Sequence, residues 1–426
     1  MYRHALVGII ALSVIIGLLA GCAGAPPSAV PTPSPAAVPP SQALAAPTPA
    51  GPVTLTLWHR WPERFAASVR QLLDEFEQTA GIRVEMTYQA SLHEALGEAR
   101  AAGRLPDVVA MPGDYLSLAV ENGWLQPAEP LFDPAMLEET YLPAGLEALR
   151  YQGHLWGLPL NLHTQTFIYN MDLISEAELS ADTAELVAKA QQYQAAHPGV
   201  WYLVYPARDD VYFAAAWFYG AGAWYAREDG SVGLNTPQAA AAAEFIASLR
   251  GIMPADIDLT KADALFKAGQ AAITINGIWY LAELDAAGIR YGLQIMPVVS
   301  ASGMPARPLV AADGLMISSQ CQRPAEAARL IAYLTNAESA LRLARGHSVV
   351  PANRLAIQRA GQEGLWIVAH YARQAELGQP LPAAPYWPAV LPAVRDALEA
   401  VWAGQPPAEA LQSAQAAAEK LISALR

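Results

Sequence analysis

Residues 53–86 read VTLTLWHRWPERFAASVRQLLDEFEQTAGIRVEM. Apolar and polar residues alternate over 53–58, which predicts a β-strand. Apolar residues at helical spacing follow, and Gly81 stands just past them, where a helix commonly ends. The alternation returns over 82–86. The stretch therefore predicts a β-α-β unit, and such units build parallel sheets through right-handed crossovers.

Strand and helix patterns alternate along the rest of the chain. Thr236 is a residue type that often caps a helix, and Pro237 follows it in the first turn. This pair is typical of a helix start. Further strands are expected over 108–111, 271–275 and 291–296. Further helices are expected over 91–102, 115–121, 235–249, 324–334, 388–402 and 407–425. The alternation predicts an α/β fold, and 426 residues suffice for two folded lobes.

The charge balance excludes some classes of function. The formal net charge is −13, with 26 Lys and Arg against 39 Asp and Glu. A basic surface for nucleic acid or for anionic lipid is therefore missing. The histidines are scattered without metal-ligand spacing, so we expect neither a metal nor a cofactor.

The N-terminus has the pattern of an export signal. Arg3 and His4 precede an apolar run over 5–20, and small residues lead into Cys22. This describes a secretory signal peptide over 1–22, with a retained membrane anchor as the alternative. Leu-Ala-Gly before Cys22 resembles the bacterial lipobox. That resemblance implies a lipidated Cys22 at the start of the mature chain, and hence a lipid-anchored protein that faces the periplasm or the exterior.

Residues 23–52 are almost entirely Ala, Pro, Ser and Thr and contain no apolar period. This composition predicts a disordered, semi-rigid tether between the membrane and the folded body. Cys321 is the second of the two cysteines. With Cys22 lipidated, Cys321 has no partner, and no disulfide supports the fold.

Weak motifs in a fixed order resemble those of the extracellular solute-binding proteins of bacterial ABC importers, in the group that includes maltose-binding protein. The resemblance covers nearly all of 53–426. After the opening β-α-β stretch, the motifs are LPDVVAM with ENGWLQP, GHLWGLPLNLHTQTFIYNMDLI, ALFKAGQAAITINGIWYL, PAEAARLIAYLTNAESA and VRDALEAVWAGQPPAEALQSA.

The resemblance implies a periplasmic-binding-protein fold of type II, with the ligand held between two α/β lobes. Lobe 1 is expected to comprise 53–161 and 313–345, and lobe 2 to comprise 162–312 and 346–426. The chain is expected to cross between lobes near 159–162, 309–313 and 345–350. The resemblance further implies a monomer without enzymatic activity that delivers its solute to the permease of an ABC importer.

Sugars present hydroxyl groups and C–H faces, so a sugar site needs polar side chains mixed with aromatic ones. Ligands of α/β sheets lie beyond the carboxyl ends of strands. The first strand ends in a cluster with Trp58, Arg60 and Trp61, which are candidate ligand contacts; packing of the two tryptophans under the first helix is the alternative. Asp114 and Tyr115 follow the strand over 108–111, where Asp114 is either a ligand contact or a helix cap.

The resemblance to the family adds further candidates for ligand contacts. These are His163, Asp210, Tyr212, Trp224, Asn276, Trp279, Asp313 and Trp387. Trp279 matches the family's stacking tryptophan, and Asp313 either contributes a carboxylate or turns the chain. His163 stands where maltose-binding protein has a carboxylate. The abundance of tryptophan in these segments favours a carbohydrate.

Other functions remain as alternatives. A glycoside-active enzyme would use paired carboxylates such as Asp114 and Asp210, whose separation the sequence does not give. Motifs for a nucleophile elbow, a phosphate loop or a dinucleotide site are absent from the sequence. A binding protein for glycerol phosphate or a polyamine, or a sensor lipoprotein, would keep the fold and change the ligand or the partner. For a phosphate ester, only Arg60 and Arg208 are suitably placed.

Overall fold

The computed structural model describes residues 53–425. The predicted signal peptide over 1–22, the lipidated Cys22 and the tether over 23–52 lie outside these residues. Within 53–425, no helix combines the length and the apolar character needed to cross a bilayer.

The larger of the two main sheets begins with the β-α-β unit. β1 (Val53–His59) pairs in parallel with both β2 (Ile82–Tyr88) and β3 (Val108–Pro112). β15 (Leu309–Ile317) then pairs antiparallel with β3 and with β6 (Gly157–His163). The edge strands are β2 and β16 (Val350–Pro351), which pairs with β6. In addition, β17 (Gln379–Pro380) pairs with the start of β15.

Helix α1 (Glu63–Ala80) covers this sheet with the apolar face that its periodicity predicts. Residues such as Leu72 and Phe76 are buried on that face. The helix ends at Gly81, which adopts the left-handed conformation (φ 68°) that glycine permits without steric cost. Helices α11 (Pro324–Leu334) and α12 (Ala337–His347) pack against α1, so distant parts of the chain build one lobe.

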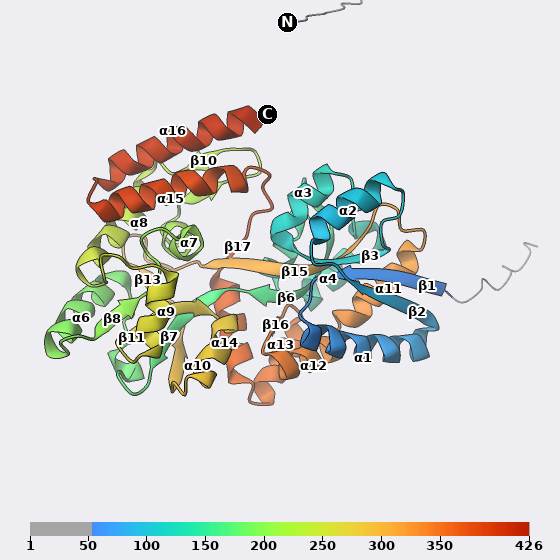
Figure 1. Ribbon diagram of the computed structural model, residues 1–426, viewed down its shortest axis with the longest axis horizontal. Coiled ribbons are helices and arrows are strands. Elements are labelled where there is room, and N and C mark those ends of the chain that lie inside the picture. Colours follow the sequence, from blue (N-terminus) through green and yellow to red (C-terminus); the bar gives the residue numbers. More distant parts are fainter. Residues whose placement is uncertain (1–52, 426) are drawn as a thin grey trace, which may run out of the picture. The chain divides into compact units, whose positions relative to one another are not determined.

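The smaller sheet has the strand order β12-β7-β11-β8. Its strands are β7 (Gln165–Asn170), β8 (Trp201–Val204), β11 (Ala271–Gly277) and β12 (Tyr291–Gln294). β7 and β11 are buried along their whole length, so they lack the alternation of a half-exposed strand. This sheet is the centre of the second lobe (Figure 1).

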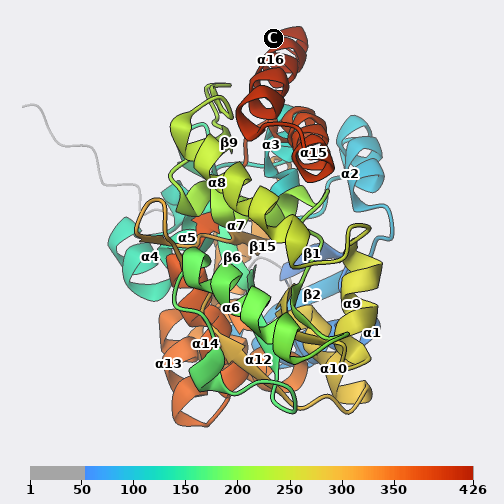
Figure 2. The same ribbon diagram turned by 90° about the vertical axis from the view of Figure 1, so that its left-hand side faces the viewer.

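The chain passes from one sheet to the other at Thr164, since β6 belongs to the larger sheet and β7 to the smaller one. Helix α14 (Trp366–Leu377) packs against β6 and β7 and so contacts both sheets. Figure 2 shows α15 (Trp387–Ala403) lying with α16 (Pro407–Leu425) over α8 (Pro237–Ser248). The architecture is a two-lobed α/β fold.

The remaining helices are α2 Leu92–Ala101, α3 Leu116–Glu121, α4 Pro134–Thr140, α5 Pro143–Glu147, α6 Thr183–Ala196, α7 Val211–Gly220, α9 Leu259–Lys267, α10 Leu281–Ala286 and α13 Arg354–Gln362. The 3-10 helices are η1 Gly113–Tyr115, η2 Glu129–Leu131, η3 Glu176–Glu178, η4 Leu249–Gly251 and η5 Ile278–Tyr280. Short hairpins join β4 Arg150–Tyr151 to β5 His154–Leu155, β9 Trp224–Ala226 to β10 Val232–Gly233, and β13 Val298–Val299 to β14 Met304–Pro305.

The elements predicted from periodicity are confirmed within a few residues. Thr236 caps α8 by accepting a hydrogen bond from the backbone of Ala239, as the Thr-Pro pair predicts. Two boundaries differ. The helix expected over 115–121 begins as a 3-10 turn, and the strand expected over 291–296 ends at Gln294, since the Met296 amide instead bonds the side chain of Gln374.

Candidate functional site

A cavity of about 920 Å³ lies where loops from both sheets meet, and we call it the cleft. The predicted residues that line it are Asp114, Tyr115, His163, Asp210, Tyr212, Trp279 and Trp387. The other lining residues are Asp209, Val211, Ala311, Leu381, Pro388, Leu391, Arg395 and Glu399.

Strand direction explains why these side chains converge. Asp114 follows β3, Asp210 follows β8 and Trp279 follows β11, so each lies beyond the carboxyl end of a strand. His163 is the last residue of β6. Such positions are the usual ligand sites of open α/β sheets. The cleft is therefore built by residues that are distant in sequence and share one end of their sheets.

Three ionisable side chains interact on the first-lobe side of the cleft. The Nε2 atom of His163 lies 2.8 Å from Oδ2 of Asp313. Burial alone would lower the pKa of His163, but the charge and hydrogen bond of Asp313, with the charge of Asp114, raise it above its ordinary value. Burial also raises the pKa of Asp114, and the Asp313 carboxylate adds to that rise. The ion pair thus attaches β6 to β15 beside the cleft.

Asp210 has a structural role at the cleft in addition to its position there. Its Oδ1 atom accepts hydrogen bonds from the backbone amides of Tyr212 (2.9 Å) and Phe213 (3.2 Å), which makes it the N-cap of α7. The backbone oxygen of Tyr212 in turn accepts a hydrogen bond from the Gln165 side chain at 3.2 Å. These contacts fix Tyr212 at the wall of the cleft.

Trp279 presents a large exposed aromatic surface to the cleft. Its side chain is 48% exposed, although most of η5 around it is buried. Gly277 lies directly against the ring, because a Cβ atom at that position would be 2.0 Å from Cζ3 of Trp279. The absence of a side chain at Gly277 is what permits this ring position.

Asn276 does not line the cleft, although it lies only three residues from Trp279. It is 2% exposed, and its Oδ1 atom accepts a hydrogen bond from the Gly277 amide at 2.9 Å. Its Nδ2 atom donates to Asp263 at 3.3 Å, and its backbone oxygen accepts from Tyr371. These contacts hold the turn that leads into η5.

Helix α15 contributes two charged residues that the sequence reasoning missed, Arg395 and Glu399. Together with Trp387 and Leu391 they recur every four residues and so lie on one face of the helix. Helical spacing from the predicted Trp387 was the signal that could have identified them. The ring of Trp387 lies 5.7 Å from that of Tyr225, which supports it from the second lobe.

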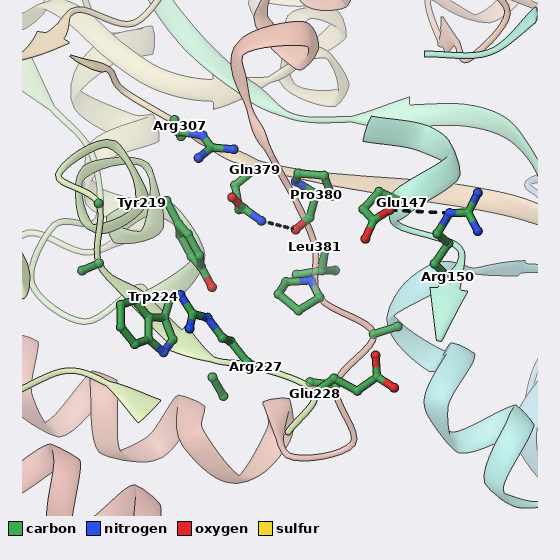
Figure 3. Close-up of a pocket in the computed structure, with 16 residues that line it drawn as sticks. Glu147, Arg150, Tyr219, Trp224, Arg227, Glu228, Arg307, Gln379, Pro380 and Leu381 are labelled. Carbon is green, nitrogen blue, oxygen red and sulfur yellow. Dashed lines mark hydrogen bonds and ion pairs between the residues drawn. The ribbon is translucent and has the colours of Figure 1, made fainter. Parts of the chain in front are cut away.

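Other predicted contacts lie outside the cleft. Trp58 packs half-buried against the core, and Trp61 is buried with its ring 4.9 Å from that of His59. Arg60, Trp61 and Asp313 line a separate cavity of about 280 Å³. Trp224 lines a third cavity of about 430 Å³, where the Arg227 guanidinium lies 3.9 Å from its ring centroid (Figure 3).

The charges of the cleft are mostly negative. Asp114, Asp209, Asp210 and Glu399 line it together with Arg395 and the partly exposed His163. With Trp279 and Trp387, this set offers aromatic faces and hydrogen-bonding groups. Within 53–425, no group of three or more His, Cys, Asp or Glu side chains is arranged to hold a metal ion.

The sequence is similar to sugar-binding proteins. It is 25% identical over 376 residues to the galactooligosaccharide-binding protein of Bacillus subtilis, covering 84% of this chain and 87% of that protein. It is 24% identical over 252 residues to the maltotriose-binding protein of Pyrococcus abyssi, covering 58% of this chain and 54% of that protein.

The fold is similar to a solved structure, that of a cyclo/maltodextrin-binding protein complexed with maltotetraose. The TM-score is 0.80 at 26% sequence identity, and the match covers 88% of this chain and 99% of the other. The family model described as bacterial extracellular solute-binding protein matches residues 71–363. Since that match spans more than half of the chain, the protein belongs to the bacterial extracellular solute-binding family.

Proposed function

We propose that the protein captures a carbohydrate in the cleft and delivers it to the membrane permease of an ABC importer. The observation that carries this proposal is the half-exposed ring of Trp279 at the strand ends, in a cleft that carboxylates and Tyr115 also line. An aromatic face contacts the C–H surface of a sugar, and carboxylates accept hydrogen bonds from its hydroxyl groups. The sugar-binding relatives support the same ligand class.

The charge of the cleft narrows the substrate to neutral sugars. Its four carboxylates, at Asp114, Asp209, Asp210 and Glu399, repel an acidic sugar, and Arg395 with His163 offsets only part of that charge. The volume of about 920 Å³ is at the upper end of the range for small-molecule sites, which favours an oligosaccharide.

Closure of the two lobes on the sugar follows from this arrangement. We propose the lobe boundaries expected from the sequence, with 53–161 and 313–345 in lobe 1 and the remainder of 53–426 in lobe 2. In support, β1, β2 and β3 belong to the larger sheet and β7, β8 and β11 to the smaller one. The strands β6, β15 and β16, which pair with one another in the larger sheet, lie at the proposed crossings between the lobes. A sugar that contacts Asp114 on one side and Trp279 on the other favours the closed form, because only that form makes both sets of contacts.

The same proposal places the protein outside the cytoplasm, attached through a lipid on Cys22 and extended by the tether over 23–52. It acts as a monomer and does not turn over its ligand. Cys22→Ser should release the protein from the membrane fraction, and incorporation of labelled palmitate should be lost with it. Retention of the label in the variant would contradict lipidation at Cys22.

The binding function is tested on the soluble body, residues 53–426. Neutral mono- and oligosaccharides are titrated while tryptophan fluorescence and melting temperature are followed. A ligand at a hundred times its Kd stabilises the native state by about 2.7 kcal/mol, which gives a clear shift in melting temperature. Hydrolysis of the same oligosaccharides is followed by chromatography, and release of smaller sugars would contradict a pure binding role.

Two tryptophan variants locate the site. Trp279→Ala should abolish the response to the sugar, whereas Trp366→Ala should leave it intact. Trp366 is a matched control because it is 51% exposed, compared with 48% for Trp279, and does not line the cleft. A saturable sugar response that survives in Trp279→Ala would contradict the proposed site.

A further inference from the structure

The cavity of about 430 Å³ that Trp224 lines adjoins the cleft at Leu381, which lines both. We call it the arginine pocket. Its walls come from Glu147 and Arg150 on one side, from the segment around β9 on another, and from β17 with the residues after it (Figure 3). It contains three arginines, although the whole chain has only 26 Lys and Arg against 39 Asp and Glu.

Arg227 is held in this pocket by an aromatic ring. Its guanidinium carbon lies 3.9 Å from the ring centroid of Trp224, a distance typical of a cation–π contact. Gly233 lies directly against the same ring, since a Cβ there would be 2.4 Å from Cδ2 of Trp224. With Gly233 and Arg227 both on the ring, Trp224 positions the guanidinium and has little free face for a sugar.

Arg307 lines the same pocket from the segment just before β15 (Figure 3). Its guanidinium makes one long hydrogen bond, 3.5 Å from Nη2 to the oxygen of Gly378. Tyr219 lines the same pocket. Burial raises the pKa of its hydroxyl, and the positive charges of Arg307 and Arg227 offset part of that rise. The Tyr219 hydroxyl accepts a hydrogen bond from the Tyr225 amide at 3.4 Å, which leaves its own proton for another acceptor.

The two carboxylates that line the pocket, Glu147 and Glu228, have partners other than Arg227 and Arg307. Glu147 lies 3.6 Å from Arg150, and Glu228 accepts a hydrogen bond from the Gln152 amide at 2.8 Å. Among residues 53–425, neither Arg227 nor Arg307 takes part in an ion pair within 4.0 Å. Arg227 and Arg307 therefore line a cavity in which no described carboxylate lies at ion-pair distance from either of them.

We propose that the arginine pocket is a second ligand site, which binds the oxyanion of a small molecule through Arg227, Arg307 and the hydroxyl of Tyr219. Guanidinium groups match the planar geometry of carboxylate and phosphate, and such charge-assisted hydrogen bonds are stronger than neutral ones. The ligand is a free inorganic oxyanion or the acidic group of a sugar acid. The site does not depend on what fills the cleft, whose carboxylates repel the same ligands.

The test is calorimetric titration of the body, residues 53–426, at constant ionic strength. The probes are inorganic phosphate, glucuronate and, as the uncharged counterpart of glucuronate, glucose. Arg227→Gln and Arg307→Gln each remove one donor group and should weaken binding by about tenfold or more. Arg290→Gln is the matched control, because Arg290 pairs with Asp172 at 2.7 Å, is exposed and lies outside the pocket.

Each outcome bears on the proposal. The proposal is supported if phosphate, glucuronate or both bind saturably, and if this binding is lost in the two pocket variants and kept in Arg290→Gln. The probe that binds more tightly then identifies the source of the oxyanion. Absence of binding by both anions, or binding unchanged in the pocket variants at unchanged melting temperature, overturns it. Trp279→Ala separates the two sites, since it should abolish a sugar response and leave the anion response intact.

Discussion

The substitution Gly277→Ala should displace the ring of Trp279 and leave the other side chains of the cleft unchanged. The backbone at Gly277 (φ −91°, ψ 173°) is extended, a conformation that alanine adopts without strain. The new Cβ would lie 2.0 Å from Cζ3 of Trp279, whereas ordinary contact begins at 3.4 Å. The ring must therefore withdraw by about 1.4 Å, the difference between these two distances. The half-exposed ring has room to move, so we expect little loss of stability.

The consequence should appear in ligand affinity. A well-placed aromatic contact contributes about 0.5–1.5 kcal/mol beyond the area that it buries. Its loss should raise the Kd of the bound sugar by about two- to tenfold, measured by calorimetric titration. Gly251→Ala is the control, because no atom lies within 4 Å of the Cβ position there. A Kd unchanged in Gly277→Ala, with the same melting temperature as the wild type, would refute a stacking role for Trp279.

Three further predictions concern charged side chains in or near the cleft. Asp210→Ala removes the N-cap of α7 and should lower the free energy of unfolding by about 1 kcal/mol in a urea titration; Asp209→Ala, which leaves the cap, should cost less. The pKa of His163 is raised in the folded state, so the stabilisation from its pair with Asp313 is complete below about pH 6.5 and is lost as pH rises through the raised value. The difference in Tm between wild type and His163→Gln should therefore shrink at alkaline pH, and a constant difference would contradict the pair. Burial raises the pKa of Asp263 from 3.8 to about 6, so the folded state binds this proton more tightly, and stability should fall as pH rises through that interval. Asp263→Asn should remove this slope, and an identical pH profile in the variant would be evidence against it.

The periodicity of apolar residues predicted the helices and strands that have one buried and one exposed face. The alternation over 53–58 and the apolar face of α1 are visible because one side of each element is buried and the other is exposed. β7 and β11 gave weaker signals, since every residue in them is buried. Here the family motif, and not an alternation of polar and apolar residues, predicted Trp279 after β11 as a ligand contact.

The side-chain contacts of the site depend on pairs that the sequence does not reveal. Asn276 and Trp279 belong to one motif, yet the structure turns one inward and leaves the other exposed. Asn276 turns inward because its side chain donates a hydrogen bond to Asp263, which lies on helix α9. Likewise, Asp313 meets His163 across a distance of 150 residues in sequence. Residue type and strand position predicted which segments converge, but only the packed structure shows which side chains find partners there.

We propose that the cleft and the arginine pocket bind ligands of different charge, and one shared residue links the two cavities physically. Leu381 is nearly buried and lines both the cleft and the arginine pocket. The cleft is rich in carboxylates and the pocket in guanidinium groups, so a neutral sugar and an oxyanion have little reason to compete for one site. Energetic coupling between them requires that one ligand change a conformation that the other senses. Two elements have access to both cavities: the segment that follows β17, through Leu381, and helix α7, which contributes Tyr212 to the cleft and Tyr219 to the arginine pocket. Any such coupling is expected to act through the position of one of them.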